Sequence, residues 1–362
     1  MTDDARDELP NHAIAVDDPP GIEVDRVTSW LAERIDWLAA PLTWERLPGG
    51  HSNFTYRVID ANGRAFVLRR PPLGELLPSA HDMGREYRII EALWSTAVPV
   101  PEPLAHCTDV DVTGAPFYAM GQVRGRSLYL RSDVEELVPE ANRHSLGVSF
   151  IDVLTDLHAI DPDEVGLGRL GKPEAYVTRQ LNRWYASWNA SKTAERPEVD
   201  ALVEFLLARV PEQGRARVVH GDYGLHNCIS TPEGYVAAVV DWEISTLGDP
   251  MADLAYALNG WIEPGDADPA RPEAPVLAPG FPRRAELLAR YAERTGADVS
   301  QIDFYSAFNH WKTVCIIEGV YARYLKGQKS TVGVDLDGLC HSRDRSLSLA
   351  VERAGAFGFV AP

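Results

Sequence analysis

The chain has 362 residues, 45% of them hydrophobic, so it can bury one large core or two modest ones. Its formal net charge of −18 argues against nucleic acid and anionic membrane surfaces as partners, because both would repel it. The four scattered cysteines form no CxxC pair, no apolar run approaches the roughly 20 residues that cross a bilayer, and no secretory signal is visible; together these features predict a cytoplasmic protein.

The elements expected first along the chain are mainly extended. Residues 1–20 hold six Asp or Glu residues and end in Pro-Pro, which predicts a flexible acidic tail. Apolar residues then recur at helical spacing over 24–38. Asn62-Gly63 is a strong signal for a hairpin turn between two strands. The other expected elements are a turn at 47–53 between extended segments, strands at 54–59, 65–69, 104–107 and 117–122, and a helix at 81–97.

From residue 142 onward the chain is predicted to be mainly helical. A strand, a loop and a hairpin over 217–240 interrupt the helices. Residues 262–281 contain five Pro and four Asp or Glu, which indicates a long loop beside a substrate site. We predict a first unit over 21–122 and a second over 123–362. The expected helices span 142–159, 173–190, 198–210, 250–261, 282–294, 301–325 and 341–354.

The most informative residues follow the predicted strand at 217–219. A His-Gly-Asp tripeptide occupies 220–222, Asn227 comes after it, and Asp241 ends an apolar strand. Phosphoryl transfer from ATP needs a carboxylate for the acceptor hydroxyl and oxygen ligands for the Mg²⁺ that neutralises the triphosphate. A kinase catalytic loop supplies these groups from an Asp and an Asn at this separation and from a later Asp. The combined spacing predicts a kinase-like site.

These motifs resemble those of the aminoglycoside phosphotransferase-like small-molecule kinases, a family related to choline kinases. The resemblance rests on segments 220–227, 241–243 and 248–255 and extends over about residues 47–258. The most similar branch is that of kinase domains attached to certain acyl-CoA dehydrogenases. The resemblance implies an α+β, protein-kinase-like two-lobed fold. A small N-terminal lobe would hold an antiparallel sheet plus a helix, and a larger C-terminal lobe would be mainly helical.

Asp222 is the expected catalytic base, which orients the acceptor hydroxyl and takes its proton. An Asp that only caps the turn after a strand is the alternative. Asn227 is expected to give Mg²⁺ a neutral oxygen ligand and Asp241 a charged one. Because a carboxylate at the end of an apolar strand is unfavourable without a partner, its position also favours Asp241 as a metal ligand.

Three further residues are expected to support the catalytic loop. His220 is predicted to brace the loop by hydrogen bonding rather than to act on substrate. Asp249 precedes Pro250, and this pair is a favourable helix start. Asp253, one turn further along, is expected to hold the loop rather than to bind metal.

The residues that bind the ATP phosphates are expected in the first unit. Ser52 and the backbone up to Asn53 lie where a protein kinase has its glycine-rich loop, although an ordinary β-turn would also fit. In place of a phosphate-binding Lys the chain has Arg69, whose expected partner is Glu86. Because neighbouring strand residues point to opposite faces, only one of Arg69 and Arg70 can face ATP, and we predict Arg69. An exposed arginine pair is the alternative.

Met120, Gly121 and Val123 are expected at the adenine. Their segment resembles the strand and hinge of a kinase, where backbone atoms of Gly121 and Val123 would bond the base and Met120 would pack behind it. A buried strand would explain Met120 equally well. Trp184 and Trp188 share one helix face and are predicted to be core residues, with an acceptor pocket as the alternative.

The sequence therefore predicts an ATP- and Mg²⁺-dependent phosphotransferase that acts on a hydroxyl of a small molecule, as a monomer or a homodimer, without nucleic-acid or membrane partners. Two acceptor classes stay open: cationic aminoglycoside-like compounds, and hydroxyacyl or other lipophilic hydroxy compounds. A regulator that binds nucleotide without catalysis is one alternative, supported only by Arg69. A protein kinase is less favoured, because no long activation segment follows Asp241.

Overall fold

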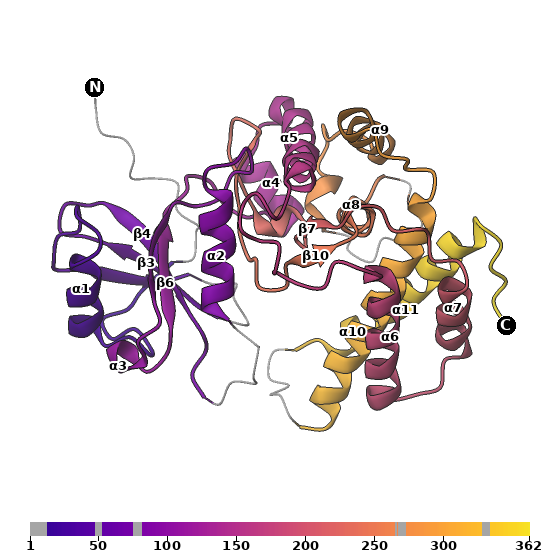
Figure 1. The fold of residues 1–362 in the computed structure, drawn as a ribbon, viewed down its shortest axis with the longest axis horizontal. Coiled ribbons are helices and arrows are strands. Elements are labelled where there is room, and N and C mark those ends of the chain that lie inside the picture. The colour runs from indigo at the N-terminus through magenta and orange to yellow at the C-terminus, as the bar shows by residue number, and fades with distance from the viewer. Residues whose placement is uncertain (1–12, 48–52, 75–81, 265, 267–272, 328–333) are drawn as a thin grey trace.

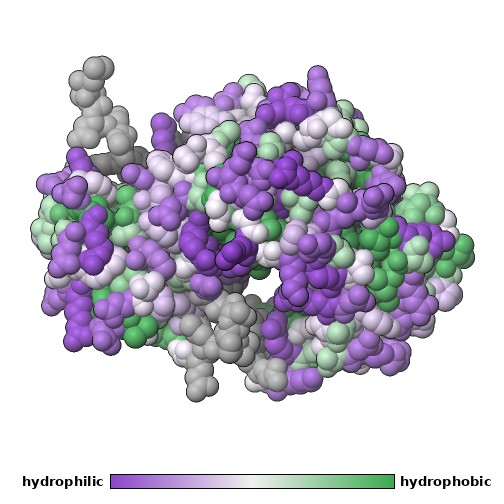
Figure 2. Space-filling view, in the orientation of Figure 1, coloured by the Kyte–Doolittle hydropathy of each residue, from purple (hydrophilic) through white to green (hydrophobic). Residues whose placement is uncertain are grey.

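The computed structural model describes residues 13–47, 53–74, 82–264, 266, 273–327 and 334–362. Two parts lie side by side (Figure 1): a sheet with α1, α2 and α3, and a larger part built mainly of helices. Hydrophilic side chains cover most of the face seen in Figure 2, as expected for a net charge of −18. Among the described helices, none is long and apolar enough to span a membrane.

The first part is a six-stranded antiparallel sheet in the order β1-β2-β3-β4-β6-β5. Its two faces follow the period-two alternation of strand side chains. Phe66 and Leu68 of β4 pack with α1 on one face, whereas Val67 packs with α2 on the other. The strands are β1 (Ile14–Ala15), β2 (Thr43–Arg46), β3 (Phe54–Ile59), β4 (Ala65–Arg70), β5 (Pro103–Cys107) and β6 (Phe117–Gly121).

The predicted strands of this sheet are confirmed, but the segment before them differs from the expectation for 1–20. Ile14 and Ala15 form a strand that pairs with β2, and the carbonyl of Pro20 accepts a 2.7 Å hydrogen bond from Tyr56. Residues 13–20 are therefore held against the sheet, while 1–12 lie outside the described residues. The acidic composition predicted a flexible tail over 1–20, but the backbone of Ile14 and Ala15 pairs with β2 and holds this part of the segment in place.

The helices of the first part are shorter than predicted. Asp82 caps α2 (Met83–Leu93) by accepting a hydrogen bond from Arg85 N at 2.9 Å, which fixes the start of the helix. The hydroxyl of Thr96 donates to Leu93 O at 2.7 Å in the turn after its last residue. The other two helices are α1 (Val24–Ala32) and α3 (Val110–Thr113), of which α3 was not expected.

The second part is mainly helical, as predicted. It holds α4 (Arg131–Leu137), α5 (Glu140–Ala159), α6 (Tyr176–Ser191), α7 (Pro197–Leu207), α8 (Pro250–Asn259), α9 (Arg284–Thr295), α10 (Ile302–Leu325) and α11 (Leu336–Gly355). The apolar helix α10 lies centrally and packs against α6, α8 and α11. The sequence analysis missed α4 and the early start of α11, where Asp335 caps the helix through Gly338 N.

Short strands interrupt the helices where the catalytic segment was expected. The predicted hairpin is present as β8 (Cys228–Ser230) and β9 (Val236–Val239), which pair antiparallel. The strand that leads into the loop, β7 (Arg217–Val219), pairs with β10 (Thr246–Gly248), which was not predicted. These two strand pairs support the intervening loop, residues 220–227, on both sides.

Candidate active site

The loop after β7 places the carboxylate of Asp222 beside Asn227. The side-chain amide of Asn227 donates to the carbonyl oxygen of Asp222 at 2.9 Å and to its Oδ2 at 3.1 Å. Gly221 has φ +84°, a left-handed conformation that glycine adopts without strain. The turn at Gly221 and the two bonds from Asn227 fix the direction of the Asp222 carboxylate.

The carboxylate of Asp222 also accepts a hydrogen bond at each oxygen from neighbouring side chains. The hydroxyl of Tyr256, on α8, donates to Oδ1, and His226 Nε2 lies 3.4 Å from Oδ2. Burial raises the pKa of Asp222, but the bonds from His226 and Tyr256 outweigh it and bring the pKa to about 2. Asp222 is therefore ionised at neutral pH, and 38% of its side chain remains exposed.

His220 connects the catalytic loop to the strand β9 and its extension. Its Nε2 lies 3.0 Å from the carbonyl of Val240, and its Nδ1 lies 3.3 Å from the backbone N–H of Asp222. A carbonyl can only accept and an amide N–H can only donate, so His220 is the tautomer with the proton on Nε2. The ring is fully buried and makes no contact with the cavity described below.

Asp253, on α8, holds the start of the same loop. Its carboxylate accepts hydrogen bonds from the backbone N–H groups of His220 at 2.7 Å and Gly221 at 2.8 Å, and from His158 Nε2 at 3.3 Å. Burial raises the pKa of Asp253, but the bond from His158 and the other donors outweigh it, so the pKa lies below its ordinary value. The carboxylate is thus a buried, charged acceptor for three donors.

Asp249 is the N-cap of α8. Its Oδ1 accepts from Met251 N at 3.0 Å, and its Oδ2 accepts from the hydroxyl of Tyr305 at 2.8 Å. Burial raises the pKa of Asp249 despite these bonds. Asp249 therefore fixes the start of the helix that carries Asp253 and Tyr256.

Asp241 follows β9 with Val240 between them, in a backbone conformation that is rare for residues other than glycine. Its φ is +66°, which costs about 1–2 kcal/mol for a residue with a Cβ. Its Oδ1 accepts a 2.7 Å hydrogen bond from Arg69, and 35% of its side chain is exposed. The neighbouring Val240 N–H donates to Asn227 O at 2.9 Å, which brings the segments of Asp241 and Asn227 together.

Arg69 lies on the sheet face toward α2 and forms two ion pairs. Its guanidinium contacts Asp241 at 2.7 Å and Glu86, on α2, at 3.4 Å, and Tyr118 donates to Glu86 at 3.0 Å. Arg70 points to the opposite face, where it donates to the carbonyl of Gly21. The structure thus brings Arg69, Glu86 and Asp241 together and excludes Arg70, and neither arginine is exposed.

Asn53 is buried behind this ion-pair cluster. Its side-chain amide lies 3.4 Å from Glu86 Oε1 and 3.4 Å from Glu243 Oε2. The amide therefore contacts carboxylates, while the expected phosphate contact from Ser52 lies outside the described residues. The sequence analysis gave Glu243 no role, although it stands two residues after Asp241.

The expected adenine residues lie at the end of β6, which includes Met120 and Gly121, and in the chain after it, which includes Val123. Met120 is buried, with 7% of its surface exposed, and packs with α2 rather than standing in an open cleft. The N–H of Gly121 donates to the carbonyl of Glu102 at 2.8 Å, so this donor is already used within the protein. The structure therefore does not leave the Gly121 N–H for the expected contact with a base.

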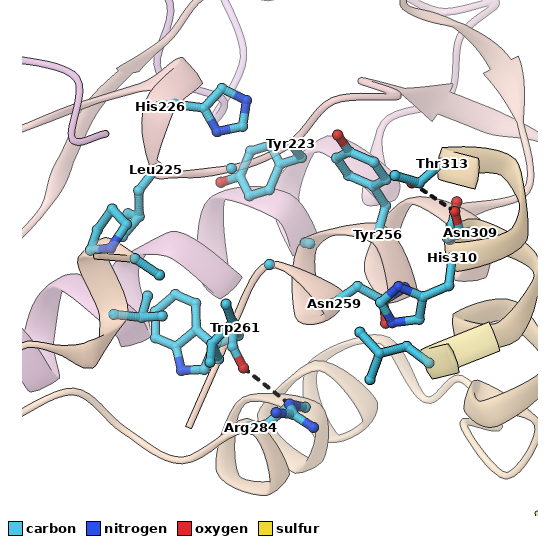
Figure 3. A pocket seen from close by; sticks show the side chains of 18 of the residues that line it. Tyr223, Leu225, His226, Tyr256, Asn259, Trp261, Arg284, Asn309, His310 and Thr313 are labelled. Carbon is cyan, nitrogen blue, oxygen red and sulfur yellow. Dashed lines mark hydrogen bonds between the residues drawn. The ribbon is translucent and has the colours of Figure 1, made fainter. Parts of the chain in front are cut away.

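A cavity of about 690 Å³ opens beside Asp222 in the helical part. Figure 3 shows His226 and Tyr223 along one side of it and His310 and Arg284 on another. Most of these residues were not predicted. Residues 262–281 were expected beside a substrate site, and Ile262, Asp266 and Val276 of this segment do line the cavity. Trp184 and Trp188 do not line it and belong to the core, as predicted.

Asn227 and Asp241 provide the kind of oxygen atoms that Mg²⁺ binds. The amide nitrogen of Asn227 is turned toward Asp222, which leaves its side-chain oxygen for a cation. The described residues hold no group of three or more His, Cys, Asp or Glu side chains that could bind a metal. Mg²⁺ commonly binds through one or two protein oxygens together with waters and substrate phosphates. An Asn and a partly exposed Asp fit that requirement.

A small antiparallel sheet with α1 and α2 on its two faces, joined to a helical part with a His-Gly-Asp loop, defines the two-lobed protein-kinase-like fold. A family model described as the phosphotransferase enzyme family matches residues 43–299, and the chain belongs to this family. It is 36% identical over 302 residues to acyl-CoA dehydrogenase family member 10 of Mus musculus. That alignment covers 82% of this chain but 28% of the mouse protein, so the chain spans only a minor part of that relative.

Solved structures agree with this assignment. A candidate aminoglycoside phosphotransferase from Ralstonia eutropha has a TM-score of 0.78 at 31% identity, covering 92% of this chain and 98% of that one. A spectinomycin phosphotransferase in complex with ADP and spectinomycin shares the fold, with a TM-score of 0.62 at 12% identity over 96% of this chain and 99% of that one. The predicted fold class and the resemblance to both groups of relatives are confirmed.

Proposed function

We propose that the protein transfers the γ-phosphoryl group of Mg·ATP to a hydroxyl group of a small molecule bound in the cavity beside Asp222. The observation that carries this proposal is the position of Asp222. Its carboxylate lines the cavity, while Asn227, which bonds it, is adjacent to Asp241 on the side of the sheet. A phosphotransferase needs its base beside the acceptor hydroxyl, next to the place where the metal holds the phosphates.

Asp222 would orient the acceptor hydroxyl and receive its proton. With a pKa of about 2 the carboxylate is a weak base, so it gains the proton only late, when the bond to phosphorus is largely formed. Tyr256 and Asn227 hold the carboxylate in place, which reduces the reorganisation needed during the reaction. Catalysis would therefore depend mainly on position and electrostatics.

The nucleotide would lie between the sheet and the catalytic loop. Arg69, held by Glu86, provides a forked cation for phosphate oxygens, and Val123 provides backbone contacts for the base. Asn227 and Asp241 would hold Mg²⁺, which when bound neutralises the charge of the triphosphate. The ADP in the spectinomycin phosphotransferase supports a nucleotide in this fold.

Two acceptor classes follow from the relatives. The spectinomycin phosphotransferase has an antibiotic bound, whereas the mouse relative carries the name of an acyl-CoA dehydrogenase family. A regulator without catalysis would need no ordered base. Asp222 instead accepts bonds from three side chains, which favours an enzyme.

The test is a panel of hydroxylated compounds incubated with Mg·ATP, with ADP release and phosphorylated product both measured. We expect acceptor-dependent ADP release that requires Mg²⁺, and a decrease of roughly 10²–10⁴-fold in Asp222→Asn with little change in ATP affinity. Asp156→Asn, which removes a carboxylate on α5 that pairs with Arg294, serves as the matched control. ATP binding without phosphorylated product across the panel would indicate a regulator.

A further inference from the structure

Lys312 is a buried cation in the helical part of the protein that no step of the proposed reaction uses. It lies on α10, and only 8% of its surface is exposed. The chain has five lysines among its 35 Lys and Arg residues, and Lys312 is the buried one of the four that the structure describes. Its neighbours Asn309, His310 and Thr313 line the cavity beside Asp222.

The face of α10 that carries Lys312 makes successive contacts with α8. The hydroxyl of Tyr305 donates to Asp249 at 2.8 Å, and one turn later the side-chain amide of Asn309 donates to a backbone carbonyl of α8 at 2.8 Å. A further turn along, the ammonium of Lys312 lies 5.1 Å from the centre of the Tyr256 ring. Positions i, i+4 and i+7 share one helix face, so the two hydrogen bonds hold the ammonium over this ring.

The ammonium of Lys312 has no hydrogen bond and no ion pair with another residue that the structure describes. Moving an ammonium group out of water is unfavourable unless negative charge nearby compensates for the lost hydration. Burial lowers the pKa of Lys312, and the carboxylates of Asp253 and Asp222 oppose this effect. The compensating charges are therefore the two acids that hold and form the catalytic loop.

Tyr256 connects the ammonium to Asp222. Its hydroxyl donates to Asp222 Oδ1, while its ring face receives the ammonium of Lys312. A cation is attracted to the negative face of an aromatic ring, and it polarises a phenol so that the hydroxyl donates a stronger hydrogen bond. Because the ammonium does not bond to Asp222 itself, this carboxylate stays available for an acceptor hydroxyl.

We propose that Lys312 is a positioning residue for phosphoryl transfer: its ammonium holds the ring of Tyr256 and balances the negative charge that Asp222 and the phosphates bring together. The inference rests on the proposed function and deepens it with a residue that does not line the cavity. Phosphoryl transfer gathers several negative charges in one place, and fixed positive charges near them lower its barrier. A cation fixed in the core needs no rearrangement when substrates bind.

The first test compares Lys312→Met with Lys326→Met, which changes an exposed lysine at the end of the same helix. Methionine keeps the length of the side chain and removes the charge, so the melting temperature of Lys312→Met should stay the same or rise. Its kcat with the panel of hydroxylated compounds should fall about tenfold or more, with little change in the KM for Mg·ATP. Lys326→Met should change none of these quantities.

The second test observes the ammonium by NMR and needs no acceptor. With lysine labelled at Cε, the intact protein gives five lysine signals, of which Lys312→Met removes one. The Hε protons of Lys312 should lie upfield of the others because of the Tyr256 ring, and Tyr256→Leu should remove this difference. Asp222→Asn should lower the pKa of the Lys312 ammonium, because a carboxylate that stabilises its charge is lost, and leave the Lys326 signal in place.

If Lys312→Met does not fold, replacing the other four lysines by arginine leaves Lys312 as the remaining signal, and the NMR test decides. An unchanged kcat in Lys312→Met, or an unchanged Lys312 pKa in Asp222→Asn, would overturn the inference. A lower melting temperature of Lys312→Met with unchanged kcat would show a purely structural lysine. If no compound of the panel is phosphorylated, the proposed function fails, and the NMR titration still decides whether Lys312 is coupled to Asp222.

Discussion

Adjacent arginines on β4 point to opposite faces of the sheet. Arg69 contacts Glu86 and Asp241, whereas Arg70 donates to Gly21 O and, at 3.1 Å, to Pro71 O. Burial of Arg69 opposes its charge, but its acidic neighbours outweigh this and raise the pKa of Arg69 above its ordinary value. Under the proposed function, this charged fork would provide the cation that protein kinases place there as Lys.

Arg69→Ala should raise the dissociation constant for Mg·ATP by roughly 10–100-fold, because a charge-assisted contact is lost. Arg70→Ala should lower the melting temperature and leave nucleotide affinity unchanged. Arg69→Lys should retain part of the affinity, and Glu86→Ala should resemble Arg69→Ala. The loss of affinity in the double variant Arg69→Ala/Glu86→Ala should be smaller than the sum of the two single losses, because both residues share one interaction. Isothermal titration calorimetry measures the affinities. A larger loss of affinity in Arg70→Ala than in Arg69→Ala would show that Arg70, not Arg69, contacts the nucleotide.

The hydroxyl of Tyr256 is expected to keep Asp222 ionised. A carboxyl whose folded pKa is depressed stabilises the fold above its unfolded pKa, and this contribution is lost as pH falls toward about 2. In Tyr256→Phe the pKa of Asp222 should rise, so the contribution should be smaller and its loss should be complete at a higher pH. Carbon-13 NMR titration of the aspartate carboxyls reads this pKa directly. Tyr305→Phe, which removes a hydroxyl from Asp249 instead, should leave the pKa of Asp222 in place.

The helix α8 organises the site at the scale of one element. Asp249 caps it, Asp253 accepts from the loop backbone, and Tyr256 reaches Asp222. The spacing of four and then three residues puts all three on one face of the helix. A single helix therefore fixes the loop's start and the direction of its carboxylate.

Asp253→Asn should destabilise the protein by about 2–4 kcal/mol, because a buried charged acceptor for three donors is replaced by a neutral amide. Urea denaturation measures the free energy of unfolding. Asp337→Asn, an exposed acid in the first turn of α11, should change it by only a few tenths of a kcal/mol. A similar loss in both variants would mean that Asp253 does not hold the loop.

The sequence predicted the helices, strands and turns that depend mainly on residues close together in the chain. Period-two strands, the Asn62-Gly63 hairpin and the Asp249-Pro250 helix start were found because each depends on neighbouring residues. Strand β10 was missed because its three residues form a strand only by pairing with β7. The pairing of β1 with β2 was missed for the same reason.

The site was predictable where residues are close in sequence. Asp222, Asn227 and Asp241 share one motif, and alternation along β4 predicted that Arg69 and Arg70 lie on opposite faces of the sheet. Tyr256 could have been found as the residue three positions after Asp253 on the same helix face. The cavity wall from α10 and α11 could not, because helices more than 80 residues after Asp222 approach it only in the folded protein.

At the scale of the whole molecule, polar contacts join the sheet part to the helical part. Arg69 reaches Asp241, and Arg85 of α2 donates to the carbonyls of Leu170 at 2.9 Å and Ser245 at 2.5 Å. Asn53 adds its contact with Glu243. A nucleotide bound between the two parts would add to these contacts and so stabilise the folded protein against heat.

Mg·ATP should therefore raise the melting temperature by several degrees, since a ligand at 100 times its dissociation constant adds about 2.7 kcal/mol. ATP with EDTA should raise it less. Asp241→Asn should lose the Mg²⁺-dependent part of the shift, because the neutral amide is a weaker ligand, and Asp222→Asn should keep it. Differential scanning calorimetry of the unmodified protein and of both variants, each with Mg·ATP and with ATP plus EDTA, measures these shifts. If the Mg²⁺-dependent shift is unchanged in Asp241→Asn, Asp241 is not a metal ligand. If the shift is lost in Asp222→Asn, the Asp222 carboxylate binds the metal instead of the acceptor hydroxyl.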